Sequence, residues 1–544
     1  MTAVADSIIP LPSLAESRPA HNPWLIAIVV SMATFMEVLD TSIANVSLHH
    51  IAGNLGAGSS EATWVLTSYL VSNAIVLPVS GWLSNVMGRK RFYMTCVAIF
   101  TVSSLLCGMA PSLGWLLVFR VIQGAGGGGL APSEQSILAD TFPARQRGMA
   151  FAVYGLAVVF APAIGPTLGG WITDNFNWRW IFYINVPVGI LSMFLTYRMV
   201  HDSPAAKAQT AETWKHGLRI DYMGFALIAL GLGCLQVVLD KGQEDDWFSS
   251  RFIQIFGTLC VIGILGGIVW EVWIADDPVV DLTLLKRSRF AFTNLLMFIV
   301  GFILNSTTVL IPQFAQQSLG YNATQAGLLL MGGGFALMVM MPVSGFLTSH
   351  IQPKYLMAYG IAVTSLAMWH MSQFNLQVTF SQLVMARIYQ AIALPFFFIP
   401  INTVAYSDLP PGKSNQASAL INLMRNLGGS TGIAIAVLLL ERRTQLHHAR
   451  LIEHLSPYDS AFMHTYHLMI NTFSGGTGGG GGGAASLVSP ATRALSVIDN
   501  MVNAQATMLA YLDVFKIMAI GCAPVIVLCL MLKKMKSHHA EMGH

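Results

Sequence analysis

Fourteen long apolar segments constrain the fold of this 544-residue chain more than any other feature. A helix needs about 20 mostly apolar residues to cross a bilayer, and each segment is long enough. Only 10% of the residues are charged, against about 25% in soluble domains, so most of the surface cannot face water. The sequence therefore predicts an all-α polytopic membrane protein. The expected spans lie near 24–46, 63–84, 92–110, 114–140, 149–172, 180–198, 220–239, 252–274, 290–313, 325–348, 355–373, 379–404, 416–439 and 510–532.

Basic residues gather on alternate connections between these segments. The connections with Arg89-Lys90-Arg91 and Lys286-Arg287-Arg289 fall on one side of the bundle, and the acidic stretch 240–250 falls on the other. Lysine and arginine accumulate on the cytoplasmic side of membrane proteins, so both termini are predicted to lie inside. Residues 1–20 are polar and contain proline, and no cleaved signal peptide is expected.

The two halves of the chain repeat each other. RVIQG at 120–124 recurs as RIYQA at 387–391, and two later matches keep the same offset of 267 residues. LPVSGWL at 77–83 recurs as MPVSGFL at 341–347. Two six-span halves with a site between them at the membrane midplane are typical of secondary transporters. The predicted parts are a tail at 1–23, a six-span half at 24–198, a linker with two inserted spans at 199–289, five spans of the second half at 290–439, a long outer connection at 440–509, and the last span with its tail at 510–544.

The outer connection contains two distinct segments. Residues 441–455 have helical periodicity and are expected to extend span 13 outward. The tract SGGTGGGGGG at 474–483 has the composition of a flexible linker. It is either natural or substituted, and the sequence leaves both open.

Ionisable residues within the spans are the first candidates for function, because a charge in the bilayer is costly to bury. With a rise of about 1.5 Å per residue, Glu37 and Arg120 come out at similar heights, and Asp40 about one turn further out. We therefore expect Arg120 to neutralise both acids. The full set comprises Glu37 and Asp40 in span 1, Arg120 and Glu134 in span 4, Arg387 in span 12 and Arg425 in span 13.

Two interpretations of this group stay open. A permanent salt bridge would only hold the helices together. Proton coupling is favoured, because two acids beside one arginine leave one acid whose protonation depends on local geometry. Glu134 is either a second proton station or a residue of the inner interface.

Other titratable groups are expected to be structural. The six cysteines lie in apolar segments without a C-x-x-C pair, which favours core packing. His447 and His448 are expected to be solvated, and Asp513 and Lys516 to form a pair near the membrane surface. We predict no metal and no cofactor.

Five short motifs follow one another along the first half of the chain: LDTSIANVSL (39–48), GWLSNVMGRKR (81–91), RVIQGAGGGG (120–129), APAIGPTLGG (161–170) and NWRWIFYINVPVG (177–189). Together they resemble the major facilitator superfamily, and more narrowly its fourteen-span drug:proton antiporters of the EmrB type. The resemblance covers residues 24 to about 440. It implies proton-driven export of hydrophobic or amphipathic drugs across the bacterial inner membrane, with both termini cytoplasmic.

The resemblance also implies partners. Such pumps work with a periplasmic adaptor protein and an outer-membrane channel, and the connection at 440–509 is the candidate docking element. The lipid bilayer, drugs and protons are the other expected partners, and no nucleic acid is expected. A transporter of one defined metabolite and a sensor that does not transport stay as alternatives. A membrane enzyme is disfavoured, because no nucleophile–base pair or metal-ligand spacing lies in a span.

The loop between spans 2 and 3 resembles the superfamily's gating motif. Its residues here are Gly81, Asn85, Gly88, Arg89 and Lys90. The family pattern has an aspartate where this chain has Asn85, so the charged latch of the family is in doubt. The gate is expected to be held more weakly, or by Asp140 instead.

Small residues and prolines follow one face of span 5. Small residues let a second helix come close, and the prolines bend the span. The resemblance identifies this stripe as the antiporter motif, which seals the outer half against leak; tight packing alone is the other interpretation. The motif comprises Gly155, Pro162, Gly165, Pro166 and Gly169.

A drug pocket is expected on the inward faces of spans 1, 2, 4 and 9. Its predicted lining is Phe35, Tyr69, Asn73, Gln123 and Asn305. The glycine run of span 4 is expected to leave a groove for a neighbouring helix or a substrate. Arg387 and Arg425 are assigned to the scaffold of the second half.

Overall fold

The computed structural model describes residues 22–143, 145–202, 204–215, 221–275, 278–407, 409–410, 413–453, 455–456, 458–475 and 489–532. The predicted N-terminal tail up to residue 21, residues 476–483 of the glycine tract and the chain from residue 533 on lie outside the described residues.

All regular structure in the described residues is helical, as predicted. The helices are α1 (Pro23–Val46), α2 (Leu48–Leu55), α3 (Ser59–Ala62), α4 (Trp64–Met87), α5 (Arg89–Met109), α6 (Leu113–Gly127), α7 (Leu130–Thr141), α8 (Arg147–Asn175), α9 (Trp180–Tyr183), α10 (Asn185–Met199), α11 (Pro204–Lys215), α12 (Tyr222–Lys241), η1 (Trp247–Ser249), α13 (Arg251–Val269), η2 (Trp270–Ile274), η3 (Leu282–Lys286), α14 (Ser288–Gln317), α15 (Ala323–Thr348), α16 (Pro353–Met371), α17 (Phe380–Ala393), α18 (Pro395–Ala405), α19 (Ser414–Glu453), α20 (Ser460–Gly475) and α21 (Pro490–Leu530).

Twelve helical stretches of the described chain are long and apolar enough to cross a membrane, by length and composition. They match twelve of the fourteen expected spans. The spans expected near 114–140 and 355–373 are helical too, as α6 with α7 and as α16, but they are not among the twelve. The membrane-spanning helical class is therefore confirmed, whereas the count of fourteen stays a prediction.

Two expected spans are interrupted near their middle, at corresponding places of the repeat. The span near 114–140 divides into α6 and α7 at Gly128 and Gly129, and the span near 379–404 divides into α17 and α18 at Leu394. Pro395, the first residue of α18, corresponds to Gly128 at the offset of 267. Proline removes a backbone donor and glycine weakens a helix, so two different residues interrupt the same element in each half.

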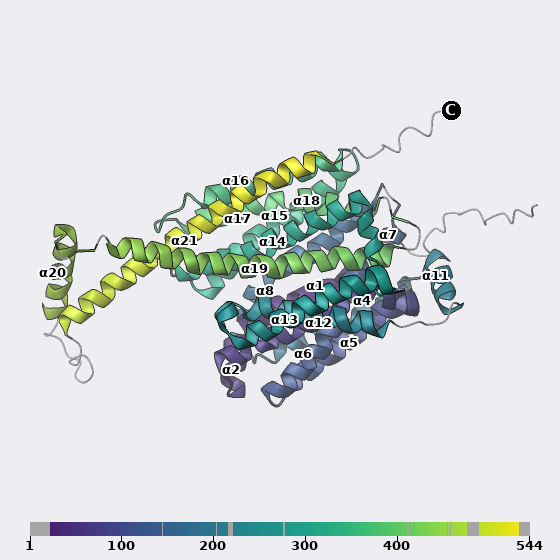
Figure 1. Cartoon of the computed structure of the whole chain (residues 1–544), viewed down its shortest axis with the longest axis horizontal. Helices are drawn as coiled ribbons and strands as arrows, with labels where there is room; N and C mark the ends of the chain where they lie inside the picture. The colour runs from purple at the N-terminus through teal and green to yellow at the C-terminus, as the bar shows by residue number, and fades with distance from the viewer. Residues whose placement is uncertain are drawn as a thin grey trace, which may run out of the picture.

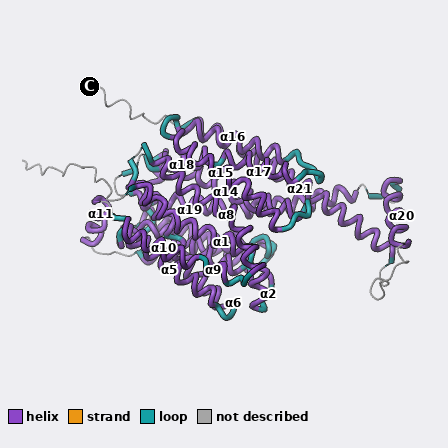
Figure 2. Tube along the Cα trace, turned by 180° about the vertical axis from the view of Figure 1, so that it is seen from behind, coloured by secondary structure: helices purple, strands orange, loops and turns teal. Residues whose placement is uncertain are grey.

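The helices form two groups that lie side by side (Figure 1). The first contains α1–α10, and the second contains α14–α19 and α21; the view from behind shows the same division (Figure 2). Between the groups, α8 packs against α15 and α4 packs against α19. The inserted helix α12 contacts α4 and α19 and therefore touches both groups.

One end of the bundle carries the basic connections. We call it the basic end; it holds Arg89 at the start of α5, Lys286 before α14, Lys354 in α16 and Lys413 before α19. Lys413 Nζ pairs with Asp281 Oδ2 at 2.8 Å. Burial alone would raise the pKa of the Asp281 carboxyl, but hydrogen bonds from Lys413 and Thr283 outweigh it and lower this pKa below its ordinary value. The linker is thereby tied to the start of α19.

At the opposite end, α19 and α21 continue beyond the bundle, and α21 contacts both α19 and α20 (Figure 1). The expected extension at 441–455 is seen, because α19 runs to Glu453. The last span, expected near 510–532, lies within a longer helix. Pro490 opens α21, and no further proline interrupts the helix until Pro524, so 490–509 and the last span are one helix.

Contacts between basic and acidic side chains join the two long helices of this extension. His447 Nε2 lies 2.9 Å from Asp513 Oδ2, and His448 Nε2 lies 3.5 Å from Asp499 Oδ1. Both histidines are partly buried against acids, so the prediction that they are simply solvated is wrong. Asp513 also pairs with Arg443, at 3.4 Å, rather than with Lys516, whose ammonium lies over the Trp369 ring.

Candidate functional site

A hydrogen-bonded network around Arg120 lies in the core of the first group. The Arg120 side chain is fully buried, and its Nη1 lies 2.6 Å from Oδ2 of the buried Asp40. Gln123 and Asn185 donate to Asp40 Oδ1 at 3.0 and 2.7 Å. The guanidinium also lies over the Tyr69 ring, 4.4 Å from its centroid. Both charges are thus compensated inside the protein, as a buried ion pair requires.

Arg120 pairs with Asp40 and not with Glu37, which corrects the expected neutralisation of both acids. Helical rise gives the height of a residue but not the direction in which its side chain points. Asp40 faces α6 and α10, whereas Glu37 accepts hydrogen bonds from Tyr69 Oη at 3.3 Å and Asn73 Nδ2 at 3.1 Å on α4. Span 1 therefore presents its two acids to different surroundings.

The second half repeats the arginine without its acid. Arg387 is buried and donates to Gln390, just as Arg120 donates to Gln123 at 2.8 Å. Among the described residues, Arg387 forms no ion pair, and its Nε has no hydrogen-bond partner. The Arg–Gln pair thus belongs to the shared scaffold, while the acid partner is special to the first half.

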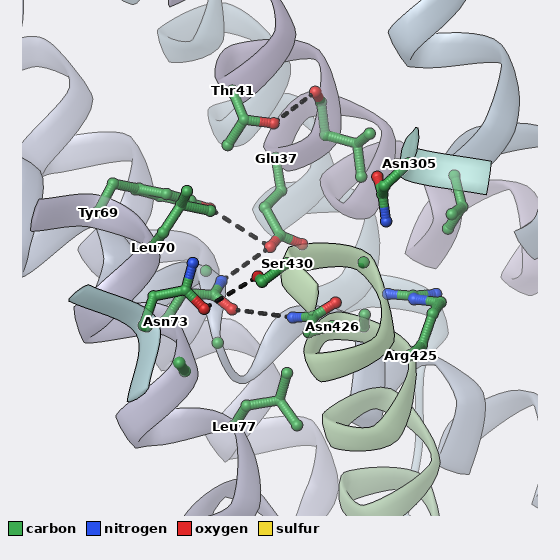
Figure 3. Close-up of a pocket in the computed structure, with 18 of the residues that line it drawn as sticks. Glu37, Thr41, Tyr69, Leu70, Asn73, Leu77, Asn305, Arg425, Asn426 and Ser430 are labelled. Atoms are coloured by element: carbon green, nitrogen blue, oxygen red, sulfur yellow. Dashed lines mark hydrogen bonds between the residues drawn. The ribbon is translucent and has the colours of Figure 1, made fainter. Parts of the chain in front are cut away.

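A cavity of about 220 Å³ lies between the two groups (Figure 3). Its walls come from α1, α4, α6, α7 and α8 on one side and from α12, α14 and α19 on the other. Three of the five predicted pocket residues line it: Tyr69, Asn73 and Asn305. Phe35 and Gln123 do not, because Phe35 packs in an apolar cluster and Gln123 serves the Arg120 network.

Two charged side chains of opposite sign line this cavity. Glu37 comes from α1, and Arg425 comes from α19 (Figure 3). Arg425 donates to Tyr154 Oη, and its guanidinium lies 5.9 Å from the centroid of that ring. The sequence had assigned Arg425 only to the scaffold, because an arginine in a span does not reveal which face it occupies.

Three neutral polar residues that line the cavity were not predicted from the sequence: Gln236, Asn426 and Ser430. Asn426 donates to Asn73 Oδ1 at 3.4 Å, across the two groups. Ser430 donates to Gln236 Oε1 at 3.0 Å, so the inserted helix α12 supplies part of the wall. Gln236 is a lone amide in an apolar helix, and this feature of the sequence could have indicated that α12 faces a polar site.

Glu134 is completely buried in α7, away from any interface with water. Ser31 of α1 donates to one of its carboxyl oxygens, and the other oxygen has no partner among the described residues. Burial of a carboxylate with an unpaired oxygen is costly, and burial of the neutral, protonated carboxyl costs less. This arrangement disfavours the inner-interface interpretation of Glu134.

The glycine run of α6 gives close contact with two neighbouring helices. A Cβ on Gly124 would overlap the Tyr69 carbonyl oxygen of α4, and a Cβ on Gly126 would lie 2.8 Å from the Phe100 backbone nitrogen of α5. Gly127 and Gly128 also border the cavity. The expected groove is therefore filled mainly by helices, and only its edge is open to a ligand.

The stripe on α8 packs against α1 in the same way. Added Cβ atoms at Gly165 and Gly169 would meet Ser42 and Ile43, and Ser42 Oγ donates to the Pro162 carbonyl at 3.4 Å. Gly155 instead faces α15 and α18, through Met341 and Phe398. Pro166, like Pro162, lies inside the helix. Tight packing is what the geometry displays, and a sealing role stays a prediction.

The two groups contact each other at the basic end. Asn415 Nδ2 of α19 donates to Asn85 Oδ1 at 2.6 Å, and a Cβ on Gly81 would lie 3.0 Å from the Gln416 Cα. Arg89 pairs with Asp140, the residue named as the alternative latch. Ser414 Oγ of α19 in turn donates to Asp140 Oδ1 at 3.4 Å. The amide contact and the hydrogen bond from Ser414 to Asp140 thus join the two groups at this end.

The rest of the gating loop is fixed to the first group. Gly88 has φ +84°, a left-handed backbone conformation that favours glycine, at the turn between α4 and α5. The Lys90 ammonium donates to the Tyr197 carbonyl at 2.7 Å, and the Lys90 amide donates to Asp202 Oδ1 at 2.9 Å. The loop is therefore ordered by α10 and the residues that follow it.

Deeper in the interface, the repeat is visible as a contact. Gln135 Nε2 donates to Asn402 Oδ1 at 3.4 Å, and these residues are separated by the repeat offset of 267. Asn422 donates to Gln135 Oε1 at 2.7 Å and accepts from Tyr154 Oη at 3.2 Å. Corresponding positions of the two halves thus face each other.

In the described part of the chain, no cluster of three or more His, Cys, Asp or Glu could hold a metal ion.

Comparison with known proteins agrees with this architecture. Residues 30–433 match the Major Facilitator Superfamily. The multidrug export protein EmrB of Haemophilus influenzae is 38% identical over 82% of this chain and 86% of its own length. The probable multidrug resistance protein EmrY of Escherichia coli is 33% identical over 94% of this chain and 96% of its own length.

The fold is also found among solved structures. The proton:xylose symporter XylE superposes with a TM-score of 0.55 at 14% identity, over 78% of this chain and 90% of the symporter. At this identity the likeness concerns the fold alone. The family match and the curated relatives cover most of the chain. The chain therefore belongs to the Major Facilitator Superfamily and is a membrane transporter, not an enzyme.

Proposed function

We propose that this transporter exports hydrophobic and amphipathic drugs in exchange for protons, across the inner membrane of a bacterium, with its basic end in the cytoplasm. The names of the EmrB and EmrY relatives support drug export. The observation that carries the proposal is Glu37: a carboxyl inside the cavity between the two halves, which accepts hydrogen bonds from the neutral side chains of Tyr69 and Asn73.

Glu37 is the better proton carrier of the two acids in α1. Asp40 is enclosed by Arg120, Gln123 and Asn185 and does not line the cavity. An acid held in this way is shut off from the cavity. Glu37 can exchange its proton with water in the cavity, and its protonation then depends on what the cavity contains.

Glu37→Gln is expected to abolish drug uptake driven by an imposed pH gradient in proteoliposomes, because glutamine cannot carry the proton. Passive equilibration of the drug without a gradient should persist. The measurement is fluorescence of a reporter drug after a pH jump, with Asp499→Asn, remote from the cavity, as control. Full gradient-driven transport by Glu37→Gln would contradict the assignment.

We further propose that the pump works with a periplasmic adaptor protein and an outer-membrane channel, and that the adaptor contacts the α19–α20–α21 extension. Support comes from the length of this extension, which continues beyond the bundle (Figure 1). Tyr458 is 98% exposed just before α20, so this region presents an aromatic side chain at the surface.

Removal of α20 is expected to abolish drug resistance of intact cells but to preserve transport in proteoliposomes. The extension lies away from the cavity, so the transport cycle should survive its loss. The two measurements are growth in the presence of drug and uptake by purified protein. Equal resistance of cells with and without α20 would refute the docking proposal.

A further inference from the structure

The cavity has a charge of each sign on opposite walls. Glu37 belongs to the first half and Arg425 to the second, and the described residues form no ion pair between them. Figure 3 shows both side chains at the cavity, with the amides of Asn73, Asn305 and Asn426 nearby. The cavity therefore has an acidic wall on the side of the first half and a basic wall on the side of the second half.

Each charge is held in place by neutral groups. Tyr69 and Asn73 donate to the Glu37 carboxyl, and Arg425 donates to Tyr154 Oη. Such partners orient a side chain but do not cancel its charge. A charge inside a protein is screened less than in bulk water, so it interacts strongly with any opposite charge brought near it.

The remaining lining is largely apolar. It includes Leu70, Leu77, Val158, Leu304 and Ile433. These side chains can bury the body of a ligand, while the charged groups fix its orientation, as in other small-molecule sites.

We propose that the cavity selects amphipathic zwitterions: molecules with an apolar body, a protonated amine bound at Glu37 and a carboxylate bound at Arg425. The inference rests on the proposed export function and names the substrate class of its cavity. A ligand with a single charge would neutralise one wall and leave the other uncompensated. A zwitterion compensates both walls. Each of its charges pairs with an opposite charge of the cavity, and this attraction offsets the free-energy cost of removing the two charges from water.

Three probes of one shape test the inference: norfloxacin, which is a zwitterion near neutral pH, its methyl ester, which is a cation, and its N-acetyl derivative, which is an anion. Their equilibrium affinities are measured by fluorescence on purified full-length protein in nanodiscs, without a pH gradient. We expect norfloxacin to bind at least about tenfold more tightly than either derivative.

Two variants assign the charges. Glu37→Gln should lower the affinity for norfloxacin about tenfold and leave the affinity for the N-acetyl derivative unchanged within about twofold. Arg425→Gln should also lower the affinity for norfloxacin about tenfold, but it should leave the affinity for the methyl ester unchanged within about twofold. Arg443→Gln, on the same helix but outside the cavity, is the matched control. Retained binding of one derivative shows that each variant is folded.

Equal binding of all three probes, or equal weakening of all three by each variant, would overturn the inference. The outcome is separable from the export proposal, because binding is measured at equilibrium. If the zwitterion preference holds and gradient-driven export fails, only the proposed transport is refuted. If export holds and the preference is missing, only the substrate class is refuted.

Discussion

Arg120→Leu is expected to destabilise the folded protein severely, whereas Arg387→Leu is expected to leave it intact. Arg120 Nη1 pairs with buried Asp40 at 2.6 Å, and its loss would leave that carboxylate without its cationic partner. Breaking a buried pair in this way costs about 3–5 kcal/mol. Arg387 occupies the corresponding position of the second half, but the ion pairs of the described residues do not include it. Its removal takes away an uncompensated buried charge.

Thermal unfolding of detergent-purified protein is the measurement, with the yield of monodisperse protein as a second readout. Restoration by a second substitution is the decisive control. Asp40→Asn added to Arg120→Leu removes both charges and should recover most of the lost stability, since amide donors from Gln123 and Asn185 remain nearby. Similar unfolding temperatures for Arg120→Leu and Arg387→Leu would mean that the Asp40 pair contributes little.

The repeat in the sequence predicted more of the structure than any single motif did. The offset of 267 placed Arg120 with Arg387, and both now form the same contact with a glutamine three residues on. Gln135 and Asn402, separated by the same offset, meet at the interface of the halves. A repeat is a property of the whole backbone, so its consequences survive errors in individual boundaries.

Side-chain direction was not predictable by the same means. Glu37 and Asp40 lie three residues apart, and this spacing suggested a shared face. In the structure, Asp40 contacts α6 and α10 while Glu37 contacts α4. The angular difference of about 60° between residues three apart on a helix was enough to separate a fixed ion pair from a cavity carboxyl, because three helices meet at this point of α1.

The cavity itself depends on contacts between distant segments. Arg425, Asn426 and Gln236 reach it from α19 and α12, which the sequence placed in the scaffold and in an insert. Hydropathy indicates which segments enter the membrane, but the rotation of each helix is set by packing with its neighbours. The glycine run of α6 is a second example. Its sequence predicted that a neighbouring helix comes close, but not that the neighbours are α4 and α5.

Asp140→Asn is expected to open the basic end and to shift the transporter away from the conformation described here. Asp140 receives the Arg89 guanidinium and the Ser414 hydroxyl, and it therefore joins the gating loop to the start of α19. Arg89 and Asp140 both belong to the first group, so the hydrogen bond from Ser414 is the contact of Asp140 that differs between a closed and an open basic end. A hydrogen bond to a charged acceptor contributes about 1.5 kcal/mol, which corresponds to a population shift of about tenfold.

Spin labels at Arg91→Cys and Ser349→Cys report this shift, because both positions are exposed at the basic end and belong to different halves. The six native cysteines are buried and should remain unlabelled. We expect a short distance between the labels in the parent protein and a second, longer distance in Asp140→Asn. Asp513→Asn breaks an ion pair at the opposite end and should leave the distance unchanged. An unaltered distance distribution in Asp140→Asn would leave the amide contact between Asn85 and Asn415 as the group that holds the gate.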